Sequence, residues 1–115
     1  MNNETVKIFI CQPMSGREES VVKMERRFVM KDLKRIAPDM NFEYIDNWTH
    51  PDAPKDASRL WHLGESIKQL ADADYIVFVP GWYKAKGCCV EKVIQILYKI
   101  PVINIKKEMK QRKLK

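Results

Sequence analysis

Residues 87–91, Gly-Cys-Cys-Val-Glu, place two thiols and one carboxylate within five positions. Two thiols suggest a metal site, and a zinc site needs three or four ligands at workable spacing. Cys88 and Cys89 are adjacent, however, and adjacent side chains on a helix of about 3.6 residues per turn point roughly 100° apart. His50 and His62 form no pair with either cysteine. The pattern therefore predicts no metal site, and nothing in it calls for a cofactor.

The same stretch offers two nucleophiles. A helix start can activate a thiol, but no histidine stands in a clear partner position for Cys88 or Cys89. We therefore favour the interpretation that at least one of these cysteines packs as a small side chain beside the sheet. Glu91 is the more specific candidate, because a carboxylate in the first turn of a helix is stabilised as an anion, which suits an ionised nucleophile. A plain helix-start glutamate is the alternative.

A second group of candidates is Gln12, Met14, Ser15, Gly16 and Arg17, in the loop after the first predicted strand. The loop lacks the glycines of a dinucleotide fingerprint or a P-loop. A strand–loop–helix junction still presents backbone N–H groups to an anion, and Ser15 and Arg17 would add a hydroxyl and a guanidinium. The sequence is equally compatible with a phosphate cradle and with an ordinary turn. Aromatic side chains near the same loops would either stack on a base or close the core; they are Trp48, Trp61, Trp82 and Tyr83.

Strands and helices alternate strictly along the chain. We predict strands at Val6–Cys11, Asn41–Asp46, Tyr75–Val79 and Pro101–Ile105, and helices at 18–36, 60–71 and 87–99. Leu60, Leu63, Ile67 and Leu70 are expected to face inward on the second helix, and Val90, Val93, Ile94 and Leu97 on the third. The alternation predicts an α/β fold: a small flavodoxin-like or Rossmann-like three-layer sandwich with a parallel sheet of four to five strands. Ligands of such sheets bind at the carboxyl ends of the strands, here residues 11–16, 46–48 and 80–82.

Composition limits the chain to one domain, expected at residues 1–105, with a basic and flexible tail at 106–115. The tail carries a net charge of +5, and subtracting 5 from the total of +6 leaves about +1 for the body. A nucleic-acid partner is therefore not expected, although weak salt-dependent contact through the tail is an alternative. The apolar runs are too short for a bilayer and no signal peptide precedes them, so we expect a cytoplasmic protein with reduced thiols and no membrane partner.

Several motifs occur in an order that resembles the nucleoside 2-deoxyribosyltransferase superfamily, closest to the small bacterial and phage proteins grouped as the DUF4406 family. They are KIFICQPMSG, IDNW with DAPKDAS, LWHLGESIKQLADADYIVFV, and GWYKAKGCCVEKVIQ with PVINI, which together cover residues 6 to 105. By position, the resemblance implies that Glu91 is the nucleophile of a retaining N-glycosidic reaction. The family also places an acid eight residues before Asp74, where this chain has Ser66. Gln12-Pro13 stands where relatives tend to have glycine.

The resemblance implies a nucleoside or nucleotide ligand held by Gln12, Met14, Ser15, Gly16, Arg17, Asp46, Ser66, Gly81 and Trp82. Asp46 would substitute for the missing acid, and Trp82 would wall the pocket. A hydrolase is slightly favoured over a deoxyribosyltransferase because the chain is short. The alternative is a non-catalytic module that senses or sequesters a nucleotide. A homodimer or a higher homo-oligomer is expected, because so small a sheet leaves a face to cover.

Overall fold

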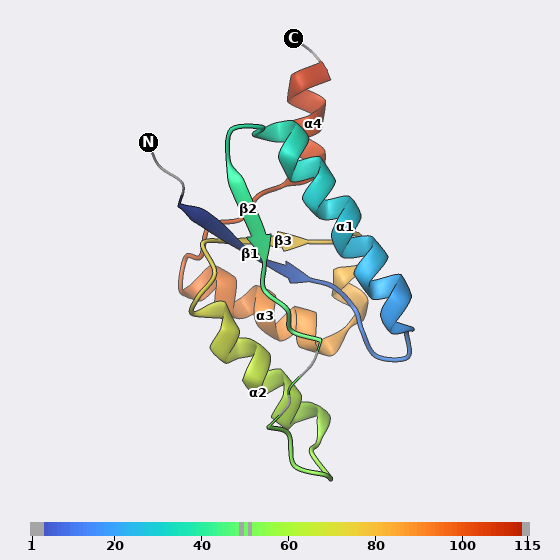
Figure 1. The fold of residues 1–115 in the computed structure, drawn as a ribbon. Helices are drawn as coiled ribbons and strands as arrows, with labels where there is room; N and C mark the ends of the chain where they lie inside the picture. Colours follow the sequence, from blue (N-terminus) through green and yellow to red (C-terminus); the bar gives the residue numbers. More distant parts are fainter. Residues whose placement is uncertain (1–3, 49, 51, 114–115) are drawn as a thin grey trace.

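The computed structural model describes residues 4–48, 50 and 52–113. Its strands are β1 (Thr5–Cys11), β2 (Asn41–Tyr44) and β3 (Tyr75–Phe78). Its α-helices are α1 (Glu19–Ile36), α2 (Arg59–Leu70), α3 (Lys86–Leu97) and α4 (Ile105–Lys113), and a 3-10 turn, η1 (Trp82–Lys84), precedes α3 (Figure 1). The three predicted helices and first three strands are confirmed within one or two residues at most boundaries. Ser58 caps α2 by accepting a hydrogen bond from the Trp61 N–H at 3.1 Å.

The three strands form one parallel sheet in the order β2-β1-β3. Ile8 of the central strand pairs with Tyr44 of β2 and with Tyr75 of β3, and Cys11 pairs with Phe78. Residues 8–11 of β1 are at most 1% exposed. A strand buried on both faces reads as a continuous apolar run, which is how Ile8-Phe9-Ile10-Cys11 reads. The α/β class with a parallel sheet is therefore confirmed.

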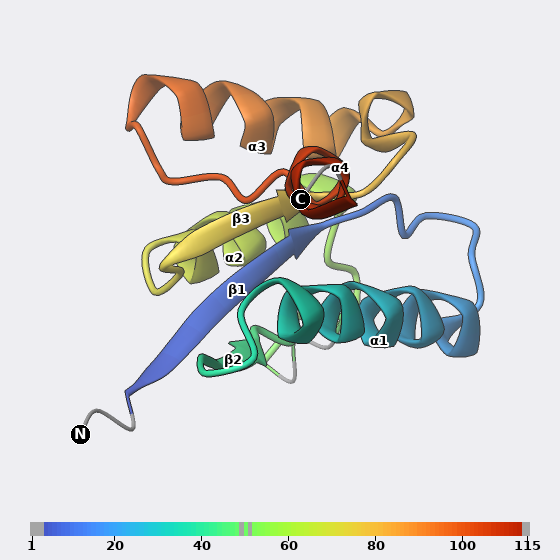
Figure 2. The same ribbon diagram turned by 90° about the horizontal axis from the view of Figure 1, so that it is seen from above.

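Helices cover both faces of this sheet, with α1 on one face and α2 and α3 on the other (Figure 2). Side chains of β1 alternate between the two sides, as a strand of period two requires. Ile8 and Ile10 pack with Leu33 of α1, whereas Phe9 and Cys11 pack with Leu70 and Cys88. The sheet thus separates two cores, and β1 contributes to both.

The predicted fourth strand is wrong for the part of the chain that the structure describes. Val102 makes one isolated parallel bridge to Ile76, and Ile103 donates its N–H to the Ile76 carbonyl at 3.0 Å. Pro101 has no N–H to add to a ladder, and Asn104 caps a helix by accepting from the Lys107 N–H at 3.0 Å. The helix cap at Asn104 takes precedence over further strand pairing, so the sheet has three strands among the described residues. The basic segment expected to be flexible forms α4, which packs against α1.

Two helices expose apolar residues that were expected to face inward. Leu60 of α2 is 75% exposed, and Val93 and Leu97 of α3 are 54% and 70% exposed. The inward face of α3 instead carries Cys88 and Glu91, which are buried. The prediction failed because an apolar stripe can be satisfied by the core or by a partner surface, and sequence periodicity does not separate these cases. None of the described helices is both long and apolar enough to cross a membrane.

Candidate active site

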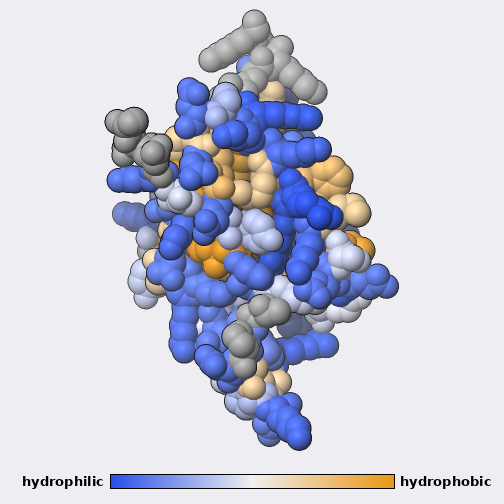
Figure 3. Space-filling model, in the orientation of Figure 1, coloured by the Kyte–Doolittle hydropathy of each residue, from blue (hydrophilic) through white to orange (hydrophobic). Residues whose placement is uncertain are grey.

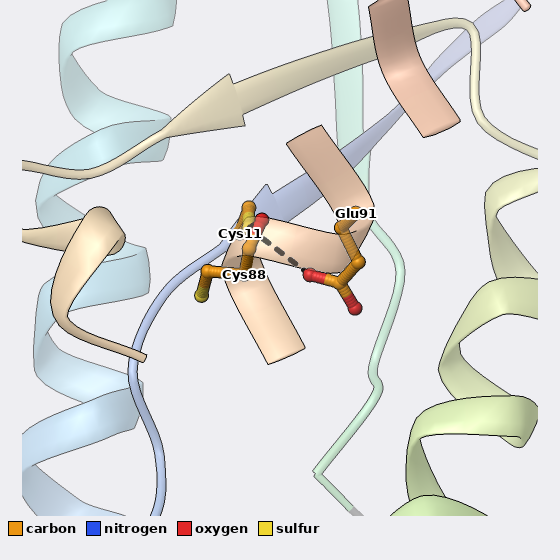
Figure 4. Close-up of side chains that lie close together, drawn as sticks. All are labelled: Cys11, Cys88 and Glu91. Carbon is orange, nitrogen blue, oxygen red and sulfur yellow. Dashed lines mark hydrogen bonds between the residues drawn. The ribbon is translucent and has the colours of Figure 1, made fainter. Parts of the chain in front are cut away.

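The side chain of Glu91 lies against the last residue of the central strand, β1. Cys88 and Glu91 lie three residues apart on one face of α3, so both point at the sheet. The Cys11 thiol, on the last residue of β1, donates a hydrogen bond to Glu91 Oε1 at 3.0 Å (Figure 4). Its sulfur also lies 3.9 Å from the carbonyl oxygen of Cys88. Sequence analysis singled out Glu91 and the stretch that contains Cys88 but missed Cys11, whose signal was its place where the central strand ends.

Burial sets the electrostatics of this thiol–carboxyl pair. Glu91 is 6% exposed, and it lies in the second turn of α3, which corrects the expectation that it lies in the first. Burial raises the pKa of Glu91 above its usual value, and the hydrogen bond from Cys11 lowers it in part. The contact with Cys88, burial and the nearby Glu91 charge all raise the pKa of the Cys11 thiol. Cys11 is therefore a protonated donor and Glu91 its acceptor.

The same three side chains could be considered as metal ligands. The two sulfurs and a Glu91 oxygen lie within 4.8 Å of one another. Tetrahedral zinc with bonds of about 2.3 Å would need the sulfurs about 3.8 Å apart and both deprotonated. The raised pKa of Cys11 and the proton that it shares with Glu91 oppose that state. We interpret the group as a hydrogen-bonded pair, and the absence of a metal remains a prediction.

A second polar group lies on the α1 face and was missed by sequence reasoning. Arg26 of α1 is 1% exposed. Its Nε donates to Gln12 Oε1 at 2.5 Å, its Nη1 to Asp46 Oδ1 at 3.3 Å, and its Nη2 to Asn47 Oδ1. Nη2 also lies 3.5 Å from the Met14 sulfur. A signal was present, because position 26 falls within the apolar stripe of α1 that Val22, Val29 and Leu33 mark.

Gln12 was predicted to hold a base or a sugar, and its surroundings favour another role. The side chain is 2% exposed, and both the oxygen and the nitrogen of its amide are hydrogen-bonded. Its oxygen accepts from Arg26, and its Nε2 donates to Glu25 Oε1 at 2.6 Å and to the Val22 carbonyl at 3.4 Å. Gln12 therefore links the end of β1 to α1. Met14 reaches the same network through its sulfur.

The predicted phosphate side, Ser15 to Arg17, is the exposed turn between β1 and α1. Gly16 has φ +77°, a left-handed conformation that glycine adopts readily. Arg17 Nη1 donates to the Pro13 carbonyl at 2.8 Å and to Glu25 Oε1 at 3.0 Å. The helix that follows begins with Glu18 and Glu19. Because acidic residues at a helix start repel an anion, this turn is a weaker phosphate site than the sequence suggested.

The remaining predicted residues divide between the two faces of the sheet. Ser66 of α2 is 5% exposed, one turn after Leu63, whose side chain faces Gly87 of α3. Gly81 has φ +83° and starts η1. The half-buried Trp82 ring lies 5.2 Å from the Phe78 ring and packs against the core that contains Cys11 and Cys88. Asp46 leaves the sheet after β2, with its side chain 55% exposed.

A histidine pair lies in and after the loop between β2 and α2. The Nδ1 atoms of His50 and His62 are 2.8 Å apart, so one ring must donate and the other accept. The rings are stacked, with centroids 5.1 Å apart. Burial and the charge of His62 lower the pKa of His50. The pair was not predicted, because its contact depends on a loop conformation.

A groove lined by described residues lies elsewhere. It runs between α1 and β2, encloses about 920 Å³ and is lined by Phe28, Phe42, Met24 and basic side chains. Figure 3 shows a mainly hydrophilic surface with apolar patches in its upper half, over this region. The groove contains neither Glu91 nor Arg26, so we do not place the chemistry there.

Comparison with known proteins adds no assignment, since the chain matches no family model, no curated protein and no solved structure.

Proposed function

We propose that the protein binds a nucleoside or nucleotide at the carboxyl edge of its sheet and cleaves the N-glycosidic bond with Glu91. The observation that carries the proposal is a buried carboxyl held by a thiol donor at the end of the central strand. Parallel sheets bind ligands at that edge. The resemblance to the nucleoside 2-deoxyribosyltransferase superfamily, and with it a flavodoxin-like or Rossmann-like fold, is part of the same proposal.

The reaction would take place in two displacements. A Glu91 oxygen attacks the anomeric carbon, the carbon–nitrogen bond breaks, and the base leaves with the bonding electron pair and takes up a proton from solvent. Water then attacks the sugar ester, which restores the Glu91 carboxylate and releases the sugar with retained configuration. Attack by a second base in place of water would make the protein a transferase. We favour the hydrolase.

Burial of Glu91 suits this chemistry in one respect and limits it in another. A carboxylate with little water around it interacts strongly with the positive charge that develops on the sugar. At 6% exposure, however, Glu91 can be reached only when neighbouring side chains move aside. Substrate binding must therefore open the site, and truncated ligands should react poorly.

Base release is the direct test. The wild type and Glu91→Gln are incubated with a panel of nucleosides and 5′-nucleotides, with and without an acceptor base, and the products are separated by chromatography. Free base from the wild type alone supports the hydrolase, and exchanged nucleoside supports the transferase. Glu43→Gln is the matched control, because Glu43 is an exposed carboxyl on the edge strand. Equal base release by Glu91→Gln would remove Glu91 from the mechanism.

A non-catalytic nucleotide-binding module is the second candidate. The observation that favours it is Ser66, a buried hydroxyl at the position where the resemblance implies an acid. Ligand-induced stabilisation without any product, in the wild type and in Glu91→Gln alike, would identify such a module.

A homodimer is part of the proposal. Val93 and Leu97 expose an apolar stripe on α3, and a second copy could cover this stripe without bringing acidic side chains together. We place the dimer contact on this face of α3, the helix that carries Glu91.

A further inference from the structure

Arg26 is a buried cation whose role is not explained by packing. It is the largest of the fully buried side chains. A charge removed from water is costly unless hydrogen bonds and opposite charge compensate for it. An apolar residue at this position of α1 would continue the stripe that Val22 and Val29 form. The role of the Arg26 guanidinium must therefore lie in the groups that its planar set of N–H donors holds in place.

Its partners come from two separate segments at the carboxyl edge of the sheet. Gln12 follows β1, whereas Asp46 and Asn47 follow β2. The Arg26 guanidinium also lies 5.5 Å from the centre of the Tyr44 ring, at the last residue of β2. One side chain of α1 thus fixes the ends of two neighbouring strands.

Asp46 differs from the other partners because it is open to solvent. Its Oδ1 accepts from Arg26 at 3.3 Å and from the Trp48 N–H at 3.0 Å. Its carbonyl accepts from Gln69 Nε2 of α2 at 3.0 Å. The backbone and the side chain of Asp46 are therefore both held by hydrogen bonds. Its Oδ2 makes no hydrogen bond to a described side chain, and the side chain is 55% exposed. A fixed acceptor oxygen that faces solvent is what recognition of a hydroxyl group requires.

Asp46 lies beyond the carboxyl end of β2, and Cys11, the partner of Glu91, lies at the carboxyl end of β1. Tyr44 pairs with Ile8, and the Ile45 N–H extends the pairing by donating to the Ile8 carbonyl at 2.8 Å. Asp46 therefore leaves the sheet on the same edge where Cys11 ends β1 and contacts Glu91.

We propose that Arg26 is a positioning residue that aims Asp46 Oδ2 at a sugar hydroxyl of the substrate, so that Asp46 is the second carboxylate of the site. The inference rests on the proposed function for the identity of the ligand, and on the geometry for the coupling between Arg26 and Asp46. Gln12 then acts through Arg26 and does not itself contact the ligand.

The coupling is tested first without any activity. The backbone amide resonance of Trp48 reports its hydrogen bond to Asp46. We expect the Trp48 amide resonance to shift in Arg26→Lys and in Asp46→Asn. The matched control is Arg27→Gln, which should leave the resonance unchanged because Arg27 is the exposed neighbour on the same helix. Lysine keeps the charge but cannot reproduce the planar fork. An unmoved Trp48 resonance in folded Arg26→Lys would overturn the proposal.

The role in binding is tested with deoxyadenosine as the probe. Its affinity, followed by the Trp48 amide shift, should fall about tenfold in Asp46→Asn, the loss usual for one hydrogen bond to a charged group. Arg26→Lys should cause a similar loss, and the double variant should lose no more than either single variant. Losses that multiply in the double variant would show that Arg26 acts only on the fold.

The outcomes separate this inference from the proposed function. Base release that depends on Glu91 but is unchanged in Asp46→Asn would refute the inference alone. Deoxyadenosine binding that depends on Arg26 and Asp46, without base release, would refute the enzyme and keep the inference. If Arg26→Lys does not fold, Asp46→Asn and Asn47→Ala replace it: the former should weaken binding, and the latter should move the Trp48 resonance because Arg26 loses a partner.

Discussion

Glu91→Gln should stabilise the protein at neutral pH. The wild-type carboxyl is buried and, among the described residues, accepts one hydrogen bond, from the Cys11 thiol. Its ionisation in that environment is unfavourable, and burial accordingly raises its pKa. Glutamine has nearly the same shape, keeps an oxygen that can accept from Cys11, and carries no charge. A residue kept for chemistry at a cost in stability is a common feature of active sites.

The direction of the pH dependence follows from which state holds the proton. As pH rises above the ordinary Glu value of 4.5, the unfolded chain loses its proton while folded Glu91 keeps it. The stability that Glu91 contributes is therefore complete below the ordinary value and is lost as pH rises through the folded pKa. The gap between Glu91→Gln and the wild type should be small in acid and should widen toward neutral pH.

The size of the stability difference between Glu91→Gln and the wild type follows from the burial of the Glu91 carboxyl group. A buried polar group that lacks a partner costs about 1–3 kcal/mol, and a charged group costs more. Replacement by glutamine recovers only part of this free energy, because the N–H groups of its amide are buried as well. We therefore expect Glu91→Gln to raise the free energy of unfolding by about 1 kcal/mol. For a domain of this length that is a rise in melting temperature of roughly 4 °C.

The assay is thermal unfolding of the wild type, Glu91→Gln and Glu43→Gln in a series of buffers from below the ordinary Glu pKa to neutral. The Glu43→Gln control removes an acid from an exposed position. A gap that is constant with pH, or a Glu91→Gln variant that is less stable than the wild type at neutral pH, would refute the reasoning.

Three further predictions concern other groups. Cys11→Ala removes the donor that lowers the pKa of Glu91, so the acidic limb of the pH–rate profile should move to higher pH, whereas Cys11→Ser should leave it nearly in place. Because the pKa of His50 is lowered in the folded state, the wild type should lose stability as pH falls through the ordinary histidine value of 6.5, and chemical denaturation should show this slope flattened in His50→Gln. Val93→Glu should convert a dimer to a monomer by light scattering, and a wild type that is monomeric at every concentration would contradict the dimer.

The sequence was sufficient for the main architecture because the signals involved are local or periodic. The continuous apolar run of β1 predicted a strand buried on both faces, and the alternation with helices predicted a parallel sheet. The segment at 101–105 failed for a local reason as well. Pro101 and the capping Asn104 compete with strand pairing, and an apolar run alone does not show that the cap prevails.

The candidate site was predictable only in part. The sequence predicted a cysteine packed beside the sheet and singled out Glu91, but Cys11 is 80 positions away from Glu91, and its contact depends on the packing of α3 on the sheet. Gln12 was assigned to the ligand because it lies in the loop after the first strand, where the resemblance places the ligand. Its amide is used by Glu25 and Arg26 instead, and the orientation of an amide cannot be predicted without its network.

The end of the central strand connects to both carboxyl groups of the proposed site. Consecutive residues of a strand point to opposite faces. Cys11 points to the face of α3 and donates to Glu91, whereas Gln12 points to the face of α1 and accepts from Arg26, which in turn holds Asp46. The chain thereby gives two carboxyl groups opposite environments, one buried beside a thiol and one exposed beside a guanidinium. Such a difference is how a fold assigns different tasks to like groups. Under the proposed function, these tasks would be attack on the sugar and recognition of its hydroxyl. Exchanging Cys11 and Gln12 should therefore disable both carboxylates, although neither residue touches the ligand in this arrangement.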